Sequence, residues 1–278
     1  MEGRTQLLSD RLVELVLNDD TWTEPHVDVL TVHPEMTYTE AYELQFEHMR
    51  RRVIDGDRIV GYKAAATSTG ARAVLETDMP LPIVGTLLAS NLACEGTQYT
   101  IKPGITFLEG EIAVLLGKDL SGPHINELDA ARAIDAVCPA IEIAPWSPST
   151  LAKQRSDQHA IATQKTDGLV VIGTPRPFEL VSDLRFEGVT MTVDGRITGS
   201  GTGIEAMGNP LTVVATIARR LSQYGLRLEA GMVIMTGSIT KPLELPADAR
   251  SARAMYTTLG NIGVRFSSAP QNGDGRGR

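Results

Sequence analysis

The sequence predicts an α+β fold in which a small helical N-terminal part precedes a larger β-rich part. Apolar residues recur at helical spacing in the first 58 residues, whereas from Val60 onward short β-branched runs alternate with glycine and proline turns. Two helical segments interrupt this second texture. Because helices and strands are segregated along the chain rather than strictly alternating, the α+β class is favoured. The predicted parts are residues 1–58, residues 59–267 and a small, polar, glycine-rich tail, 268–278, which is expected to be disordered.

In the N-terminal part, the spacing of apolar residues predicts an amphipathic helix over 5–18. Residues 20–36 are rich in proline and threonine and are expected to be irregular. Thr37 and Glu40 form the pattern of a capping box, which predicts a second helix over 38–54, closed by Gly56.

Six apolar runs predict strands in the β-rich part. They are 105–116, 139–144, 168–173, 189–199, 231–236 and 262–267. Asp194-Gly195 inside the fourth run indicates a hairpin, since this pair supplies the positive φ angles that a tight turn needs. The two interrupting helices are expected from Asn126 to about Val137, and from Pro210, after an Asn209 cap, to Tyr224.

The bulk composition is that of an ordinary globular enzyme. The chain has 278 residues, of which 42% are hydrophobic and 22% are charged. A net charge of −8 argues against a nucleic-acid partner, because phosphate backbones need a positive surface. Two cysteines are too few for a disulfide framework and fit a reducing cytoplasm. Neither a secretory signal nor an apolar stretch long enough to span a membrane is visible.

Two glutamates, Glu109 and Glu111, lie one residue apart in the apolar run 105–116. Side chains alternate across a strand, so both carboxylates are expected on one face. A third, Glu142, lies at the centre of the next apolar run. Like charges held together in a buried setting require a neutralising partner. The spacing alone leaves two readings open: a hard-cation site for Mg²⁺ or Mn²⁺, or a structural role, as a solvated strand face or in salt bridges to arginines.

Other polar residues have competing readings. Lys63 lies among small residues, and either reaches the surface or pairs with an anion. The glycine-rich stretch 199–203 lacks the Gly-Lys-Ser/Thr ending of a phosphate loop and is better read as a turn leading into a capped helix. His159 lies in a polar stretch that is expected to form a surface loop. The hydroxyls of Thr236 and Ser238 either contact a ligand or simply end a strand.

Taken in order, several short motifs resemble the 2-keto-4-pentenoate hydratase and 4-oxalocrotonate decarboxylase branch of the fumarylacetoacetate hydrolase superfamily. The resemblance runs from about Thr37 to Phe266. Its carriers are Ala41-Tyr42-Glu43-Leu44-Gln45, Gly61-Tyr62-Lys63 with Thr67-Ser68, Glu109-Gly110-Glu111-Ile112-Ala113, Ile141-Glu142-Ile143, Gly208-Asn209-Pro210, Leu228-Glu229-Ala230-Gly231, Thr236-Gly237-Ser238, and Leu259-Gly260 with Val264 and Phe266.

The resemblance implies a fold, a site and a partner. The fold would be a mixed β-roll with a small helical N-terminal part, usually assembled into homo-oligomers. The implied metal ligands for Mg²⁺ or Mn²⁺ are Glu109, Glu111 and Glu142. Catalytic roles are implied for Lys63 and, on a looser match, Asp78. The substrate would be a small anionic 2-oxo acid, and the hydroxyl-bearing residues expected to bind it are Thr67, Ser68, Thr236 and Ser238.

This chain departs from the family pattern around the substrate. It has Lys63-Ala64-Ala65 in place of lysine-x-glycine, Ala144-Pro145-Trp146-Ser147 in place of an Asp-Ser-Arg-like segment, and Thr163-Gln164 in place of an Asp-Asn pair. These departures concern the substrate pocket and leave the implied metal ligands intact.

The implied activity is that of a metal-dependent lyase acting on a 2-oxo or 2-hydroxydienoic acid in the catabolism of aromatic-ring cleavage products. Hydration is the first reading. Decarboxylation of 4-oxalocrotonate is the alternative, and it would need a further cation in the pocket, for which Arg72 and Lys165 are candidates. A reading of another class is a non-catalytic, repurposed member of the family that keeps the metal site and has lost the substrate pocket.

Overall fold

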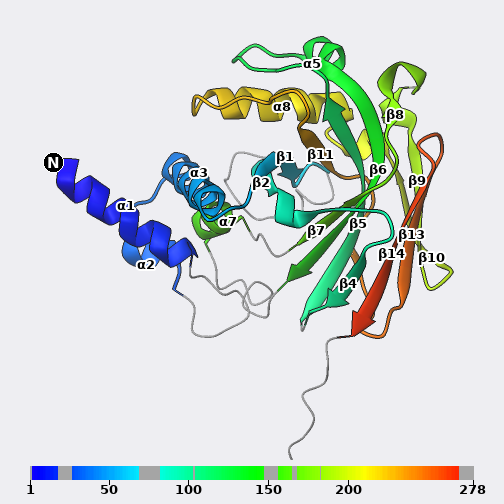
Figure 1. The fold of residues 1–278 in the computed structure, drawn as a ribbon, viewed down its shortest axis with the longest axis horizontal. Helices are drawn as coiled ribbons and strands as arrows, with labels where there is room; N and C mark the ends of the chain where they lie inside the picture. The colour runs from blue at the N-terminus through cyan, green and yellow to red at the C-terminus, as the bar shows by residue number, and fades with distance from the viewer. Residues whose placement is uncertain are drawn as a thin grey trace, which may run out of the picture.

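The structure is a computed structural model. It describes residues 2–17, 27–68, 82–102, 104–146, 156–164, 168–181 and 183–268. Two β-sheets and a group of helices make up this part of the chain, so the predicted α+β class is confirmed (Figure 1). No helix among the described residues is both long and apolar enough to cross a membrane.

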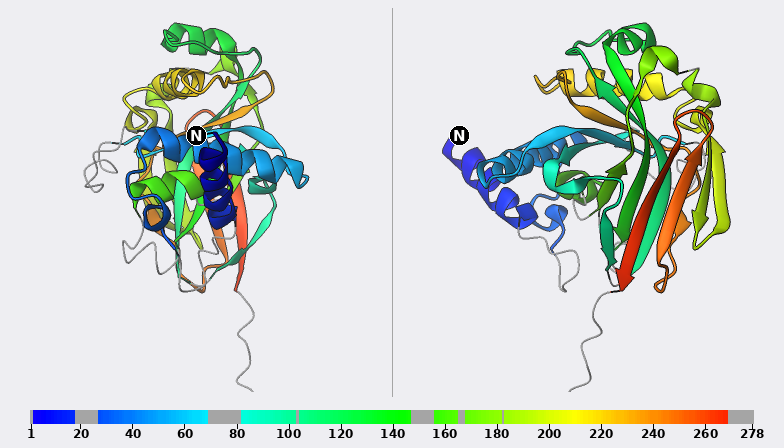
Figure 2. Two further views of the ribbon diagram at one scale, coloured as in Figure 1. Left: turned by 90° about the vertical axis from the view of Figure 1, so that its left-hand side faces the viewer. Right: turned by 45° about the vertical axis from the view of Figure 1, so that its right-hand side comes forward.

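The N-terminal helices lie at the end of the molecule away from the smaller sheet (Figures 1 and 2). They are α1 (Glu2–Leu17), α2 (Val29–Val32) and α3 (Tyr38–Ile54). The capping box predicted at α3 is present: the Thr37 hydroxyl accepts from the Glu40 amide, and the Glu40 carboxylate accepts from the Thr37 amide. The expectation of an irregular 20–36 is wrong at α2, because Asp28 accepts from the Leu30 amide and caps a short helix there.

The larger sheet has nine strands and runs in the order β2-β1-β11-β5-β6-β7-β3, with β12 added to β5 and β8 to β6. The strands are β1 (Ile59–Ala65), β2 (Ile83–Leu88), β3 (Leu92–Cys94), β5 (Ile105–Leu116), β6 (Ile134–Trp146), β7 (Leu169–Ile172), β8 (Arg176–Pro177), β11 (Val233–Ser238) and β12 (Leu243–Glu244). The long antiparallel pair β5–β6 lies at its centre, and β1 runs parallel to β11. The sheet is strongly curled, as a β-roll requires (Figure 2).

The smaller sheet has five strands in the order β10-β9-β13-β14-β4. They are β4 (Gln98–Ile101), β9 (Gly188–Val193), β10 (Arg196–Thr202), β13 (Ser251–Tyr256) and β14 (Asn261–Ser268). The predicted hairpin joins β9 to β10, and Asp194 and Gly195 both have positive φ, as a tight turn requires.

The described residues also form the α-helices α5 (Glu127–Ala133), α7 (Asp157–Thr163) and α8 (Pro210–Ser222). Asn209 caps α8 as predicted, and Asn126, expected as the first residue of its helix, is the cap of α5. The expected extension of the first helix to Val137 is wrong, because Ile134 already begins β6 and its neighbours pair with β5. The surface loop expected around His159 is also wrong. His159 is fully buried in α7, and its Nδ1 accepts from the Val29 amide at 3.2 Å.

The two faces of the larger sheet bury different kinds of residue. One face packs against the smaller sheet: a Cβ added at Gly110 would lie 3.2 Å from the Met191 sulfur of β9. The other face, inside the curl, buries a compact cluster of mostly small side chains: Leu87, Ala113, Cys138, Ala140, Val170, Val233 and Met235. Since side chains alternate along β5, Glu109 and Glu111 lie on this second face together with Ala113.

Candidate metal centre

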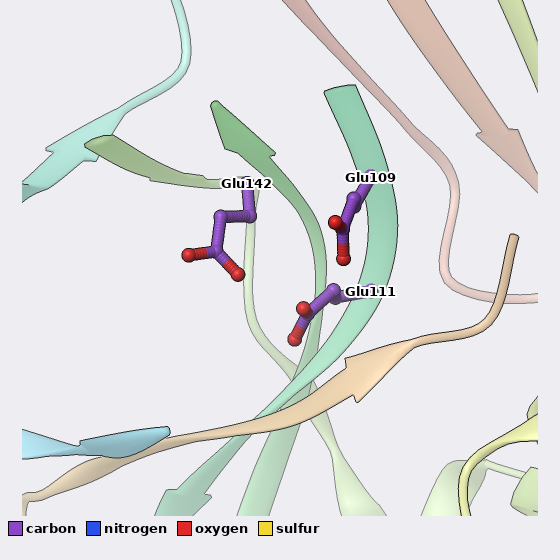
Figure 3. A group of neighbouring side chains, drawn as sticks. All are labelled: Glu109, Glu111 and Glu142. Atoms are coloured by element: carbon purple, nitrogen blue, oxygen red, sulfur yellow. The ribbon is translucent and has the colours of Figure 1, made fainter. Parts of the chain in front are cut away.

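Glu109, Glu111 and Glu142 converge inside the curl of the larger sheet (Figure 3). The register of β5 and β6 places Glu109 directly opposite Glu142, and Glu111 follows two residues along on the same face. One carboxylate oxygen from each residue lies within 4.8 Å of the others. Glu111 is 1% exposed, and the other two are partly buried. Three carboxylates therefore share one confined space.

Lys63 projects from β1 toward this group. Its Nζ lies 2.8 Å from Glu142 Oε1, and the two side chains are only 22% and 14% exposed. Of the two readings left open for Lys63, the structure has the pairing with an anion: the ammonium lies against Glu142 inside the site. Although burial works against the charged form, the Glu142 carboxylate raises the pKa of Lys63 above its ordinary value.

The three carboxyl groups differ in protonation. Burial, with the charges of Glu142 and Glu109, raises the pKa of Glu111 well above its ordinary value. Burial and Glu142 also raise the pKa of Glu109, to about 7. Burial acts on Glu142 in the same sense, but the Lys63 ammonium outweighs it and lowers the pKa of this carboxyl. Lys63 therefore balances one negative charge, and full ionisation of all three groups needs a further cation.

The donor set fits a hard divalent cation. The three side chains that converge supply carboxylate oxygens and no sulfur or nitrogen ligand. Oxygen-only sets of this kind suit Mg²⁺ or Mn²⁺ rather than a softer metal. A divalent ion would also supply the missing positive charge, so these residues could hold such a metal.

The end of β11 supports the site through its backbone. The Gly237 amide donates to Glu111 Oε2 at 2.9 Å. Gly237 has φ +86°, and a Cβ there would lie 2.1 Å from the Thr67 hydroxyl oxygen, so only glycine fits between Glu111 and the buried Thr67. The Ser238 hydroxyl donates to the Thr240 carbonyl at 2.8 Å and lies within reach of the Glu109 carboxyl, so its one proton can serve either oxygen.

The remaining residues of the expected site are placed less favourably or lie elsewhere. The Thr236 hydroxyl is fully buried and donates to the Ile112 carbonyl at 2.9 Å, a bond within the sheet that a ligand would have to replace. Ser68 is partly buried beside Thr67. Asp78, Arg72 and Lys165 lie outside the described residues. The substrate-binding and catalytic roles of these residues stay predictions.

A small pocket opens beside Lys63 and Glu142, between β1–β2 on one side and β6–β7 on the other. Its lining residues are Lys63, Thr86, Leu87, Asn91, Glu142, Gln164, Gly168 and Val170. Asn91 Nδ2 donates to the Gly168 carbonyl at 2.8 Å and holds the two sides together. Sequence reasoning missed Asn91, which carries no motif. Gln164 had a signal, because it stands where the family pattern has an Asp-Asn pair.

A tyrosine of the smaller sheet ties together the two strands that carry the three glutamates. The Tyr256 hydroxyl lies 2.6 Å from the Glu111 carbonyl oxygen and 2.8 Å from that of Ala140. These two residues face each other across β5 and β6. Tyr256 thus holds the strand pair at the level of the carboxylates, a role that no sequence pattern indicated.

The fold and the site together define a class: α+β proteins in which a curled mixed sheet carries a three-carboxylate site suited to a divalent cation. A family model for the fumarylacetoacetate (FAA) hydrolase C-terminal domain matches residues 57–266. The chain belongs to this family, as its motifs led us to expect.

The chain is also similar to individual named enzymes. The chain is 32% identical over 270 residues to a 4-oxalocrotonate decarboxylase of Pseudomonas putida, an alignment that covers 95% of this chain and 98% of the relative. It is 30% identical over 238 residues to a 2-hydroxyhexa-2,4-dienoate hydratase of Comamonas testosteroni, covering 84% and 88%. A solved structure of 4-oxalocrotonate decarboxylase from Pseudomonas putida G7, complexed with magnesium and adipate, superimposes with a TM-score of 0.81 at 28% identity, covering 96% of this chain and 98% of that one.

Proposed function

We propose that this protein is a divalent-metal-dependent lyase that acts on a 2-oxo or 2-hydroxydienoic acid, and that its reaction is a hydration. The observation that carries the proposal is the convergence of Glu109, Glu111 and Glu142 beside Lys63, at the mouth of a small pocket. The names of the relatives, hydratases and decarboxylases of small unsaturated 2-oxo acids, support the same chemistry.

In this proposal Glu109, Glu111 and Glu142 hold Mg²⁺ or Mn²⁺. When bound, the metal ion supplies Lewis acidity and a fixed point for the substrate's carboxylate and 2-oxygen. The pairing of Glu142 with Lys63 also keeps an ammonium beside this position, where it can hold the substrate carboxylate or pass a proton. Overall, one water adds across a conjugated C=C bond: the C=C π bond and one O–H bond of water break, and one C–O and one C–H bond form.

The pocket provides the surroundings that this reaction needs. Leu87 and Val170 form an apolar part of its wall, and this part continues into the buried cluster inside the curl. An apolar wall excludes bulk water and strengthens the attraction between Lys63 and an anionic substrate. Asp78 is proposed as a second proton-transfer group, and the hydroxyls of Thr67, Ser68, Thr236 and Ser238 as substrate contacts, on the family resemblance.

Decarboxylation is the second candidate, because the relative that aligns over 95% of this chain is a decarboxylase, and so is the structure with a TM-score of 0.81. That structure is complexed with adipate, a diacid, as well as magnesium. A diacid presents a second carboxylate. Among the described residues that line the pocket, Lys63 is the one cation, so the second carboxylate would depend on Arg72 or Lys165.

The deciding experiment measures turnover of 2-hydroxypenta-2,4-dienoate and of 4-oxalocrotonate, with and without Mg²⁺ or Mn²⁺, by the loss of ultraviolet absorbance. We expect metal-dependent turnover of the first substrate to exceed that of the second. Glu109→Gln and Glu142→Gln should lower metal affinity and kcat/KM together, the latter by roughly 100-fold or more. Full activity of either variant with metal still bound would show that the ligand assignment is wrong.

The same assay separates the enzyme from a binding protein that has kept only the metal site. Metal-dependent consumption of neither substrate, in a protein that binds Mn²⁺ tightly, would favour the repurposed, non-catalytic alternative. The stretch 144–165, which departs from the family pattern, is where such a change would have occurred.

We also propose that the protein forms homo-oligomers and acts in the cytoplasm. Large apolar side chains are exposed on and beside the smaller sheet, among them Leu180, Phe186, Ile197, Ile204 and Met255. Exposed apolar side chains of this size are typical of protein–protein contacts. Light scattering coupled to gel filtration tests the first proposal, and a monomeric mass at micromolar concentration would contradict it.

A further inference from the structure

The outer edge of β2 is closed by side chains rather than by another strand. Along the sheet, β2 is the end strand and pairs with β1. Two of its residues direct backbone groups away from β1. The Val84 amide donates to the Tyr42 hydroxyl at 3.0 Å, and the Val84 carbonyl accepts from Gln45 Nε2 at 3.3 Å. The Thr86 amide donates to Gln164 Oε1, and the Thr86 carbonyl accepts from Gln164 Nε2. One glutamine thus replaces a strand partner at Thr86.

Gln164 is held firmly in this role. It ends α7 in the left-handed conformation, with φ 54°, and its amide donates to the Ala160 carbonyl at 3.1 Å. This conformation is uncommon for a residue other than glycine, so the surrounding bonds must maintain it. The side chain is 8% exposed, and its Nε2 also lies 3.6 Å from the Met49 sulfur.

The stem of Gln164 lies next to that of Lys63. A Cβ built on Gly85 would be 3.3 Å from Lys63 Cγ, 3.5 Å from Lys63 Cε and 3.5 Å from Gln164 Cγ. The two stems therefore flank the same point above Gly85, which faces Lys63 in the β1–β2 register. Both residues also line the pocket beside Glu142.

We propose that Gln164 is a positioning residue for Lys63: by clamping Thr86, it packs its stem beside the lysine over Gly85 and keeps Nζ over the Glu142 carboxylate. The inference rests on the proposed function, in which Lys63 holds the substrate carboxylate or passes a proton. It also gives Gly85 a reason, since a Cβ there would lie only 3.3 Å from Lys63 Cγ and would touch the Gln164 stem.

The test compares Gln164→Met with Gln45→Met, a matched control. Both glutamines are buried and anchor the edge of β2, but Gln45 bonds Val84 and Ile161 and does not line the pocket. Gln164→Met should lower kcat per bound Mn²⁺ roughly tenfold or more, since a displacement of about 1 Å costs up to about 100-fold. Its Mn²⁺ affinity, measured by calorimetry, should stay within about twofold of the wild type, since no carboxylate has moved. Gln45→Met should leave kcat per bound Mn²⁺ unchanged. Equal kcat losses in both variants would overturn the proposal.

Gly85→Ala is an independent variant that leaves the amide clamp on Thr86 in place. Its Cβ would lie 3.3 Å from Lys63 Cγ and shift that stem by a few tenths of an ångström, so a smaller loss of kcat with unchanged Mn²⁺ affinity is expected. Wild-type kcat in Gly85→Ala would argue against a packing route from Gln164 to Lys63.

Two readouts keep this inference separate from the proposed reaction. Oxalate binding to the Mn²⁺-loaded protein should weaken several-fold in Gln164→Met and Gly85→Ala but not in Gln45→Met, whether or not any dienoate is consumed. Absence of turnover in the wild type would remove the proposed function and leave this comparison intact. A crystal structure of Gln164→Met with Nζ still 2.8 Å from Glu142 would overturn the positioning role whichever ligand is used.

Discussion

At the scale of single residues, three identical side chains behave differently because of one lysine. Glu142 is ionised because Lys63 lies 2.8 Å away, whereas burial and the neighbouring acids raise the pKa of Glu109 and Glu111. If these carboxylates hold a cation, as proposed, their closeness in the metal-free protein costs stability. A carboxylate of this kind can be identified by measuring, in one variant, the stability of the metal-free protein and the stabilisation that the metal adds.

Glu111→Gln should stabilise the metal-free protein by about 1 kcal/mol or more, because it removes a buried carboxyl that its neighbours repel. The amide oxygen can still accept from Gly237. The rise in melting temperature that Mn²⁺ causes in the wild type should be lost in this variant. Thermal unfolding with chelator and with saturating Mn²⁺ measures both effects.

Glu187→Gln is the control for this comparison. Glu187 is also buried, but it accepts from the Thr258 and Leu259 amides away from the three glutamates. It should lower the melting temperature of the metal-free protein and preserve the rise with Mn²⁺. A metal-free Glu111→Gln less stable than the wild type would contradict the repulsion described above.

From the sequence alone, residues could be assigned to the site where their spacing along one strand was enough to bring them together. Glu109 and Glu111 share a face in any strand, so the spacing placed them together, while only the register of β5 and β6 could bring Glu142 to them. His159 was misjudged and Lys63 was left open for the same reason: a polar residue in a short sequence window gives no sign of a buried partner more than 70 residues away. Gln164 depends on a contact between α7 and β2 that no periodicity reports.

At the scale of elements, the bounds of a helix or strand were predicted correctly where a local sequence pattern marks them. The run 105–116 matches β5 in full, and the capping box fixed the start of α3. The predicted helix after Asn126 was longer than α5. Its alanines favour a helix, but the pairing of Ile134 with β5 overrides that propensity. The short helix α7 was missed, because seven residues carry too little periodicity to detect.

Tyr256 bonds both strands of the pair β5–β6, and Tyr256→Phe tests how much this contact contributes to stability and to metal binding. The phenol has one proton for two facing carbonyls, and its loss should cost about 1 to 2 kcal/mol of unfolding free energy. Because one of these carbonyls belongs to Glu111, we also expect Mn²⁺ affinity to fall a few-fold. Calorimetry with Mn²⁺ measures the affinity, and denaturant unfolding measures the stability.

Tyr42→Phe is a matched control for this variant, because the Tyr42 hydroxyl also bonds a buried backbone group, the Val84 amide, but at the far edge of the sheet. It should lower stability and leave Mn²⁺ affinity unchanged. Wild-type Mn²⁺ affinity in both variants would mean that Tyr256 supports the fold alone.

At the scale of the whole molecule, the helical part and the β-rich part are joined by buried hydrogen bonds as well as by apolar packing. Gln45 of α3 donates to the Ile161 carbonyl of α7 at 2.8 Å as well as to Val84. His48 of α3 lies 3.4 Å from the Ala162 carbonyl. The predicted boundary near residue 58 therefore separates two textures of sequence, and we propose that it does not separate two independent folding units.

A fragment of residues 59–278, without the helical part, tests this proposal. We expect it to aggregate or to lack cooperative unfolding, because the edge of β2 loses its partners at Val84 and α7 loses the face of α3 on which it packs. Co-expression with residues 1–58 should restore a soluble complex that binds Mn²⁺, which controls for simple misfolding of the shortened chain. The measurements are gel filtration, thermal unfolding and Mn²⁺ calorimetry of each preparation. If the fragment alone bound Mn²⁺ with the affinity of the full chain, residues 59–267 would be an autonomous metal-binding domain, and the helices would serve only to cover it.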